Sequence, residues 1–217
     1  MPFKYSCFIS YRHGQSKLAE RIIDDLSTAL WNELELLTNK KIYVDKLRLK
    51  GGDFYNDELA RALCESACMI MVFTPTYFDR GNPYCAREFK AMEALEALRL
   101  SALEDLGGKK IGFIIPIIFR GEDFLPSEIR DKRQYYNFGE FLLSDVEISK
   151  HPRYAKTIQE IAKTVFEIDQ VVDALPQDPC KGCDTFSLPP PEEVLSWLSK
   201  LKPVSLAFPG RTQQHGK

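Results

Sequence analysis

The chain alternates between short apolar runs and longer stretches in which apolar residues recur at helical spacing. The runs have the length and β-branched content of buried strands, and the longer stretches predict amphipathic helices. The predicted strands are residues 5–10, 40–45, 68–73, 111–119 and, with a weaker pattern, 134–138; the predicted helices are residues 16–37, a helix from about 55, 83–104 and 153–172. Because proline cannot donate to a ladder, we expect Pro116 to mark a bulge or a strand end. The alternation predicts an α/β fold with helices on both faces of a five-stranded parallel sheet.

The composition changes after residue 172. Residues 173–217 hold more than half of the 13 prolines, and proline suits neither a helix interior nor a sheet interior. We therefore expect a domain over residues 1–172 and a proline-rich tail over 173–217 that contains one short amphipathic helix. A soluble protein seldom exposes an apolar stripe, so the stripe of this helix should pack on the domain or on a partner. The stripe consists of Val194, Leu195, Trp197, Leu198 and Leu201.

Charge and hydropathy limit the kinds of partner. A formal net charge of −2 gives no reason to expect direct binding to nucleic acid or to an anionic membrane. No apolar run approaches the length of a membrane span, and the first residues lack the apolar stretch of a signal peptide. We therefore expect a cytoplasmic protein.

The six cysteines of a chain without a secretion signal are expected to be free thiols. Four of them lie within apolar patterns and should be core residues: Cys7, Cys64, Cys68 and Cys85. The pair Cys180 and Cys183 has the spacing of metal ligands, but no second Cys or His pair lies nearby in the sequence. We therefore expect an incidental loop pair and no metal site.

Tyr84 and Glu88 form the first candidate site. They follow the strand at 68–73 and a polar loop, in a helix for which Asn82 is a suitable cap and Pro83 a suitable first residue. A spacing of four residues places the ring and the carboxylate on one helix face. Ligands of open α/β sheets bind beyond the carboxyl ends of strands. The pair therefore indicates either a small-molecule site or a helix surface with a solvated glutamate.

With these elements in order, residues 4–172 resemble a Toll/interleukin receptor (TIR) domain. Residues 7–12 resemble the first conserved box of the family. The second box and its BB loop are matched by Val44-Asp45, 49–52, 59–63 and Ser66, and the aromatic-Cys-x-x-Glu segment by Tyr77, Tyr84-Cys85 and Glu88. The resemblance implies a flavodoxin-like three-layer sandwich. Two features depart from the family pattern: position 84 is tyrosine where catalytic members usually carry tryptophan, and the third box with its Phe-Trp pair is missing. The chain resembles bacterial members more than animal receptors.

The resemblance implies one of two functions, since TIR domains are either scaffolds that only assemble or enzymes that cleave NAD+. Nicotinamide leaves the ribose without needing an acid, so one carboxylate can suffice where ordinary glycosidases use two. Glu88 is then the catalytic residue that stabilises the oxocarbenium charge, and the Tyr84 ring stacks on nicotinamide. The other residues assigned to substrate binding are Ser10, Tyr11, Arg12 and Ser66. NAD+ is a substrate here, and no cofactor is expected.

Three of these assignments have alternatives. Glu88 could be solvated or paired with a neighbouring cation, and Arg12 could be either a phosphate ligand or a structural ion-pair partner. Ser66 is expected to orient a loop or cap a turn, because no histidine–acid pair accompanies it as a nucleophile would require.

The resemblance also implies self-association through TIR–TIR contacts. The BB-like loop would supply the contact, and the residues assigned to it are Lys46, Arg48, Gly51 and Gly52. We expect an NAD+ nucleosidase, either a glycohydrolase or an ADP-ribosyl cyclase, in bacterial antiphage defence, working with a separate sensor or effector protein. One alternative is a non-catalytic assembly module. Another is a different ligand-binding protein of this fold, which is disfavoured because no phosphate-binding loop follows the first strand.

Overall fold

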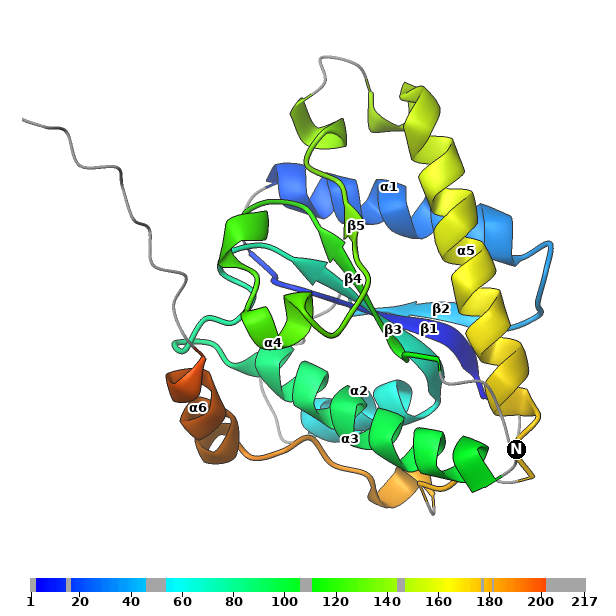
Figure 1. Cartoon of the computed structure of the whole chain (residues 1–217), viewed down its shortest axis with the longest axis vertical. Helices are drawn as coiled ribbons and strands as arrows, with labels where there is room; N and C mark the ends of the chain where they lie inside the picture. The colour runs from blue at the N-terminus through cyan, green and yellow to red at the C-terminus, as the bar shows by residue number, and fades with distance from the viewer. Residues whose placement is uncertain are drawn as a thin grey trace, which may run out of the picture.

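The computed structural model describes residues 3–14, 17–45, 54–105, 111–143, 147–176, 178–180 and 182–201. Its centre is a five-stranded sheet of order β2-β1-β3-β4-β5 in which every pair is parallel (Figure 1). The strands are β1 (Tyr5–Tyr11), β2 (Lys41–Val44), β3 (Ser66–Phe73), β4 (Ile114–Ile118) and β5 (Tyr136–Asn137). The predicted α/β sandwich with a flavodoxin-like strand order is confirmed.

Helices cover both faces of this sheet. On one face α1 packs against α5, and on the other α2 packs against α3 (Figure 1). The α-helices are α1 (Lys17–Leu34), α2 (Phe54–Cys64), α3 (Tyr84–Asp105), α4 (Ser127–Arg130), α5 (Pro152–Asp173) and α6 (Pro191–Lys200). Short 3-10 helices are η1 (Glu122–Phe124), η2 (Phe141–Leu143), η3 (Ile148–Lys150) and η4 (Cys183–Thr185). Most of the periodic apolar residues seen in the sequence face inward; α1, for example, buries Ile22, Leu26 and Leu30.

The central strands are apolar because both of their faces are covered. Every residue of β3 and of β4 is buried, as is usual for parallel strands between two helical layers. β3 pairs with β1 on one side and with β4 on the other, so its side chains form the middle of the core.

Pro116 lies inside β4 and marks neither a bulge nor a strand end, so that expectation is wrong. The reason is the direction in which its nitrogen points. Phe119 N donates to Phe73 O, so alternate residues of β4 face β3, whereas Phe138 N donates to Ile118 O on the other side. Pro116 shares the side of Ile118, and β5 starts only opposite Ile117. The missing donor therefore costs no ladder bond.

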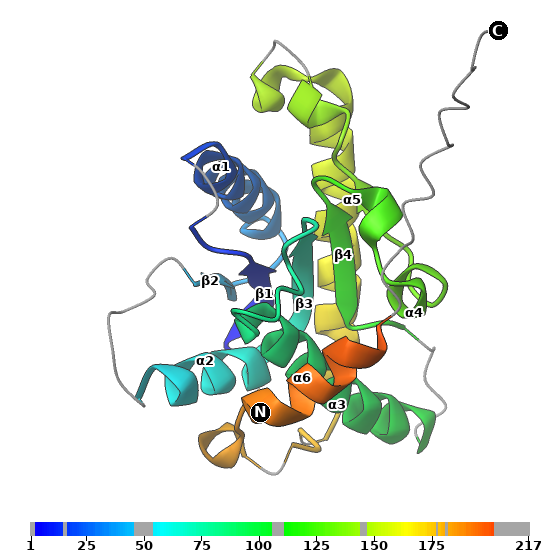
Figure 2. The same cartoon turned by 90° about the vertical axis from the view of Figure 1, so that its left-hand side faces the viewer.

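The segment after α5 returns to the domain. The α6 helix packs against the start of α3, as two perpendicular views show (Figures 1 and 2). Val194 and Leu198 are buried against Ala86 of α3, and the Trp197 ring stacks on Phe89 with 5.8 Å between centroids. This stripe was expected to pack on the domain or on a partner, and in this chain all of it except the exposed Leu195 lies against the domain.

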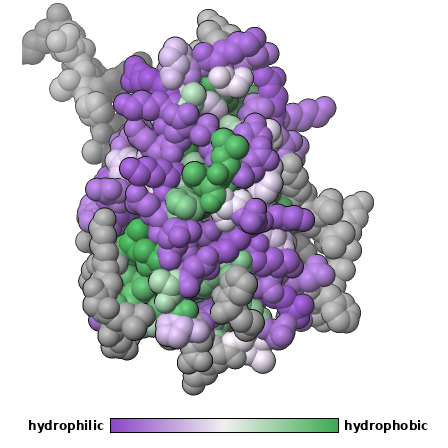
Figure 3. Space-filling view, turned by 90° about the vertical axis from the view of Figure 1, so that its right-hand side faces the viewer, coloured by the Kyte–Doolittle hydropathy of each residue, from purple (hydrophilic) through white to green (hydrophobic). Residues whose placement is uncertain are grey.

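The opposite flank of the molecule is formed by α5. Its apolar residues face inward, and Ile158, Ile161 and Val165 are among those that are buried. The surface on this side is mainly hydrophilic, with apolar residues in separate patches (Figure 3). Among the described residues, no helix combines the length and the apolarity that crossing a membrane requires.

Candidate functional site

The candidate site lies where the strand order of the sheet reverses. From β1 the chain moves outward to β2, and β3 then pairs with the other side of β1. Ligands of open parallel sheets bind at the carboxyl ends of the strands at such a switch point. In this molecule Ser10 lies near the end of β1, and α3 begins at Tyr84 after the loop that follows β3.

Glu88 is held at this point by a hydroxyl of β1. It lies in the second turn of α3 with 5% of its surface exposed, and Ser10 Oγ donates to Glu88 Oε2 over 2.5 Å. The Ser10 hydroxyl also lies 2.6 Å from the hydroxyl of Tyr77, which is fully buried in the loop after β3. Residues far apart in the sequence therefore form one hydrogen-bonded cluster of Ser10, Tyr77 and Glu88.

The direction of the hydrogen bonds in this cluster is fixed. Ser10 has a single hydroxyl proton and donates it to Glu88, so Tyr77 must be the donor to Ser10. Burial raises the pKa of Tyr77 well above its usual range, and interactions with Cys85 and Glu88 raise it further. The phenol is therefore protonated at neutral pH, and two O–H groups in series point toward the carboxylate.

Tyr77 was matched to the family pattern but was not among the predicted site residues. The sequence feature that could have identified Tyr77 is its place between the strand at 68–73 and the helix that carries Glu88. This loop starts at the carboxyl end of the strand, where the candidate site lies. A buried tyrosine needs a partner for its hydroxyl, and a nearby Ser-Tyr pair at the end of the first strand could have supplied one.

Tyr84 begins the face of α3 that Glu88 continues one turn later. Its side chain is half-buried, and the guanidinium carbon of Arg87 lies 5.6 Å from the centre of its ring. That distance fits a cation–π contact. Arg87 also donates from Nε to Pro189 O over 2.7 Å, so the Tyr84 ring is linked to the segment that leads into α6.

Arg12 and Tyr11 connect the end of β1 to neighbouring loops. Arg12 donates to the Asp79 carboxylate over 2.8 Å and to Asn82 O over 3.2 Å. This ion pair fixes the loop that precedes α3 and is the structural alternative considered for Arg12. Tyr11 donates its hydroxyl to Asp45 O over 3.0 Å. It thereby ties the end of β1 to the residue after β2.

Ser66 does not join these residues. It is the first residue of β3, at the amino end of the strand, and its buried hydroxyl donates to Ala62 O over 2.6 Å. Ser66 therefore lies at the opposite end of the strands from Ser10 and Glu88, which lie at the carboxyl end. The residues assigned to the assembly loop, Lys46, Arg48, Gly51 and Gly52, lie outside the described residues.

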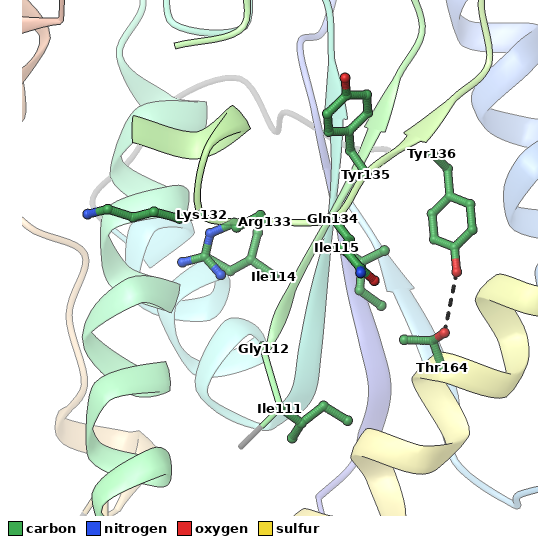
Figure 4. Close-up of a pocket in the computed structure, with 10 residues that line it drawn as sticks. All are labelled: Ile111, Gly112, Ile114, Ile115, Lys132, Arg133, Gln134, Tyr135, Tyr136 and Thr164. Carbon is green, nitrogen blue, oxygen red and sulfur yellow. Dashed lines mark hydrogen bonds between the residues drawn. The ribbon is translucent and has the colours of Figure 1, made fainter. Parts of the chain in front are cut away.

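A pocket of about 730 Å³ opens elsewhere, along the amino-terminal half of β4 (Figure 4). Ile114 and Ile115 form part of its lining, together with residues 132–136 and Thr164. One of its two cations, Arg133, is engaged by the carboxylate of Glu96 through bonds of 2.8 and 2.5 Å. The pocket occupies the side of β4 that β5 leaves uncovered, and it lacks the hydroxyl–carboxylate cluster found at the carboxyl ends.

The expectation of six free thiols is wrong for two cysteines. Cys64 and Cys183 form a disulfide, although 119 residues of sequence separate them. The CxxC pair is therefore not an incidental loop feature, because Cys183 bonds to α2 and Cys180 lies beside that bond. Cys7, Cys68 and Cys85 are buried free thiols, as expected.

Comparisons with known proteins identify the family. No curated protein matches the chain. Among solved structures, the chain is similar to the TIR domains in the structure of the activated Roq1 resistosome directly recognising the pathogen effector XopQ, at 16% sequence identity. That match covers 76% of this chain and 84% of the other, with a TM-score of 0.35. The family model described as "TIR domain" matches residues 7–146, which is more than half of the chain, and the protein therefore belongs to the TIR domain family.

Proposed function

We propose that this TIR domain is an NAD+ nucleosidase, a glycohydrolase or an ADP-ribosyl cyclase, that acts in bacterial antiphage defence. The observation that supports the proposal most is the placement of Glu88. Its carboxylate lies at the switch point of the sheet, is nearly buried, and accepts a 2.5 Å hydrogen bond from Ser10. Ligands of this kind of fold bind at the switch point, so a bound ligand would contact a carboxylate placed there.

The chemistry requires one anionic group beside the ribose. The bond to be broken joins the ribose to a pyridinium nitrogen, so the pair of electrons leaves with nicotinamide and the ribose becomes oxocarbenium-like. Glu88 would stabilise that charge and bind a ribose hydroxyl, and a fixed carboxylate does so without reorganisation. The hydroxyls of Ser10 and Tyr77 would keep the carboxylate in position.

Tyr84 would provide a face for the nicotinamide ring. It lies one helical turn before Glu88 and is half-buried. Aromatic stacking is worth about 0.5–1.5 kcal/mol, so tyrosine in place of tryptophan should weaken this contact without abolishing it. Arg12 would act on the substrate only indirectly, because its guanidinium holds Asp79 and Asn82 in the loop before α3.

The direct test is to incubate the purified chain with NAD+ and to resolve the products by chromatography. We expect nicotinamide together with ADP-ribose or a cyclic isomer. Glu88→Gln should remove the activity, whereas Glu104→Gln, an exposed glutamate on the same helix, should retain it. Equal activity in all three proteins would show that Glu88 is not catalytic.

A non-catalytic assembly module is the second candidate, and specific contacts favour it. The hydroxyl of Ser10 already occupies one Glu88 oxygen, and Arg12 is held in an ion pair. These groups could serve only to fix the loop before α3 on the sheet. No turnover of NAD+ at any protein concentration, with oligomers by light scattering, would support this candidate.

Both candidate functions involve self-association. We propose that TIR–TIR contacts bring a neighbouring copy to the site, and that a separate sensor or effector protein completes the response. If the site is composite, specific activity should fall steeply when the protein is diluted over a wide range. Constant specific activity from a species that stays monomeric by light scattering would contradict a composite site.

A further inference from the structure

Three sulfur atoms from two distant parts of the chain meet beneath α2. Cys64 is the last residue of α2, and Cys180 and Cys183 follow α5. Cys64 and Cys183 form the disulfide, the Cys180 sulfur lies 3.1 Å from the Cys64 sulfur, and all three lie within 4.8 Å of one another. Cys64 is buried, whereas Cys180 and Cys183 are partly exposed, so solvent reaches the group from one side.

We propose that Cys64, Cys180 and Cys183 form a thiol–disulfide exchange site that fastens the C-terminal segment covalently to the TIR domain. In the exchange step the Cys180 thiol loses its proton to solvent, and its thiolate attacks the Cys64 sulfur. A Cys64–Cys180 bond forms, the Cys64–Cys183 bond breaks, and Cys183 leaves as a thiolate that takes a proton from solvent. The step needs no oxidant or reductant, because one disulfide and one thiol are present before and after.

The buried residue Arg99 organises the site. Its guanidinium is fully buried in α3 and donates to Cys64 O over 2.8 Å, fixing the end of α2. It also lies 3.7 Å from the Asp178 carboxylate, and Asp178 in turn accepts a hydrogen bond of 3.1 Å from Cys180 N. Arg99 and Asp178 therefore hold Cys180 next to Cys64, as an exchanging thiol requires.

Exchange should be slow at neutral pH and accelerate as the pH rises. Burial raises the pKa of Cys180, and Asp178 adds to that rise, while the charge of Arg99 opposes it. The thiolate is the attacking species, so its fraction sets the rate over this range. Either disulfide holds the segment, so a higher pH moves the link between Cys183 and Cys180, and only a reductant releases it.

The fastened segment continues to the helix that carries the candidate site. After Cys183 the chain passes Pro189, whose carbonyl accepts from Arg87, and then forms α6, where Trp197 stacks on Phe89 of α3. The disulfide therefore adds a covalent link to a docking that also depends on these contacts. Figure 2 shows the path of α6 across α3. This inference does not depend on the reaction proposed for the domain.

The sequence makes the two disulfides distinguishable, because trypsin cleaves after Lys181. Tryptic peptides 62–80, 164–181 and 182–200 contain Cys64, Cys180 and Cys183, respectively. The full chain is oxidised with oxidised glutathione at pH 9, its free thiols are blocked at acidic pH, and linked peptides are identified by mass spectrometry. We expect 62–80 linked to 182–200 and also to 164–181, with both links lost after dithiothreitol.

Single variants then separate the roles of the three cysteines. Cys180→Ser should retain only the link to 182–200, and Cys183→Ser should form the link to 164–181, because Cys180 already touches Cys64. In wild type, dithiothreitol should lower the melting temperature by roughly 5–15 °C, the range expected for loss of a disulfide in a domain of this size. Cys7→Ala, which alters a free cysteine elsewhere, should show the same fall.

Three results would overturn the proposal. The first is the absence of linked peptides after oxidation. The second is a link that involves Cys68 in place of Cys64; Cys68 shares peptide 62–80, so fragmentation of that peptide assigns the linked residue. The third is one equivalent of zinc bound to the protein as purified, with links forming only after chelation, which would make the three sulfurs a metal site.

Discussion

Two glutamates two turns apart on α3 are both nearly buried, yet they have different surroundings. Glu88 is 5% exposed and accepts a hydrogen bond from the hydroxyl of Ser10. Glu96 is 8% exposed, receives both terminal nitrogens of Arg133, and also accepts from Phe113 N over 2.6 Å. The guanidinium neutralises Glu96 and fixes the start of β4, whereas the Ser10 hydroxyl orients Glu88. Burial alone therefore does not identify a functional carboxylate; the partner that it faces is the better guide.

The largest expected effect separates the two residues by activity. Glu88→Gln should lower the rate of NAD+ cleavage by about 100-fold or more, because the amide keeps the shape but removes the charge that stabilises the transition state. Its melting temperature should stay close to that of the wild type, since Ser10 can still donate to the amide oxygen. Rates and thermal melts measured on one preparation check both statements. A rate within a few-fold of wild type would abolish the distinction drawn between the two glutamates.

Glu96→Gln should give the converse result. It weakens a bidentate pair and leaves Arg133 with only the more distant carboxylate of Glu93, 3.6 Å away, which should lower the free energy of unfolding by about 2 kcal/mol. Activity per folded molecule should be retained, because Glu96 lies far along α3 from Tyr84. Urea unfolding gives the stability, and Glu104→Gln is the control for a glutamate on the surface of the helix. An unchanged unfolding midpoint would mean that the pair with Arg133 is dispensable.

Variants of Tyr84 test whether the ring beside Glu88 contacts the substrate. Tyr84→Ala should reduce kcat/KM by about 2- to 12-fold, the equivalent of a stacking contact of 0.5–1.5 kcal/mol. Tyr84→Phe should lose less, because the ring and not the hydroxyl is assigned the contact with nicotinamide. If the two variants lose equally, the hydroxyl is responsible and the stacking role must be abandoned.

Tyr77→Phe should have the smallest effect of these variants at neutral pH, and it should change how the stability of the fold depends on alkaline pH. Removing the hydroxyl should cost about 1 kcal/mol of stability at pH 7, the usual net value of a hydrogen bond. The folded-state pKa of Tyr77 lies above its ordinary value of 10.0, so its contribution is complete below that pH and is lost as the pH rises toward the folded-state pKa. The variant should therefore lose stability less steeply above pH 10, by up to about 1.4 kcal/mol per pH unit.

Urea midpoints measured between pH 7 and pH 11 test this prediction. Tyr43, whose pKa burial raises to about 12, is still present in the variant, so the alkaline loss should be reduced and not removed. Identical alkaline slopes in the variant and the wild type would show that Tyr77 does not titrate differently on folding.

The fold was predictable because it follows from patterns that a single sequence displays. Alternating strand and helix periodicities determine a parallel sheet with covered faces, and the position of Glu88 follows from one turn of helix after one strand. Contacts between distant segments were not predictable in the same way. The Cys64–Cys183 bond, the Tyr77–Ser10 contact and the Glu96–Arg133 pair depend on how loops return to the sheet, which no local spacing records. Ser66 shows the opposite case. It was assigned to substrate binding because it matches a family segment, but it lies at the amino end of β3, away from Glu88.

The proline within β4 has a consequence for how copies of this chain can meet. Open strand edges invite pairing with another chain, and natural sheets blunt them with short edge strands and prolines. Here β5 is two residues long and covers only the end of β4, and below it Pro116 presents no N–H toward the uncovered side. At the other edge, β2 is four residues long and begins with the exposed Lys41. Both margins of the sheet therefore resist strand addition, which directs any association of TIR domains to helices and loops and away from amyloid-like stacking.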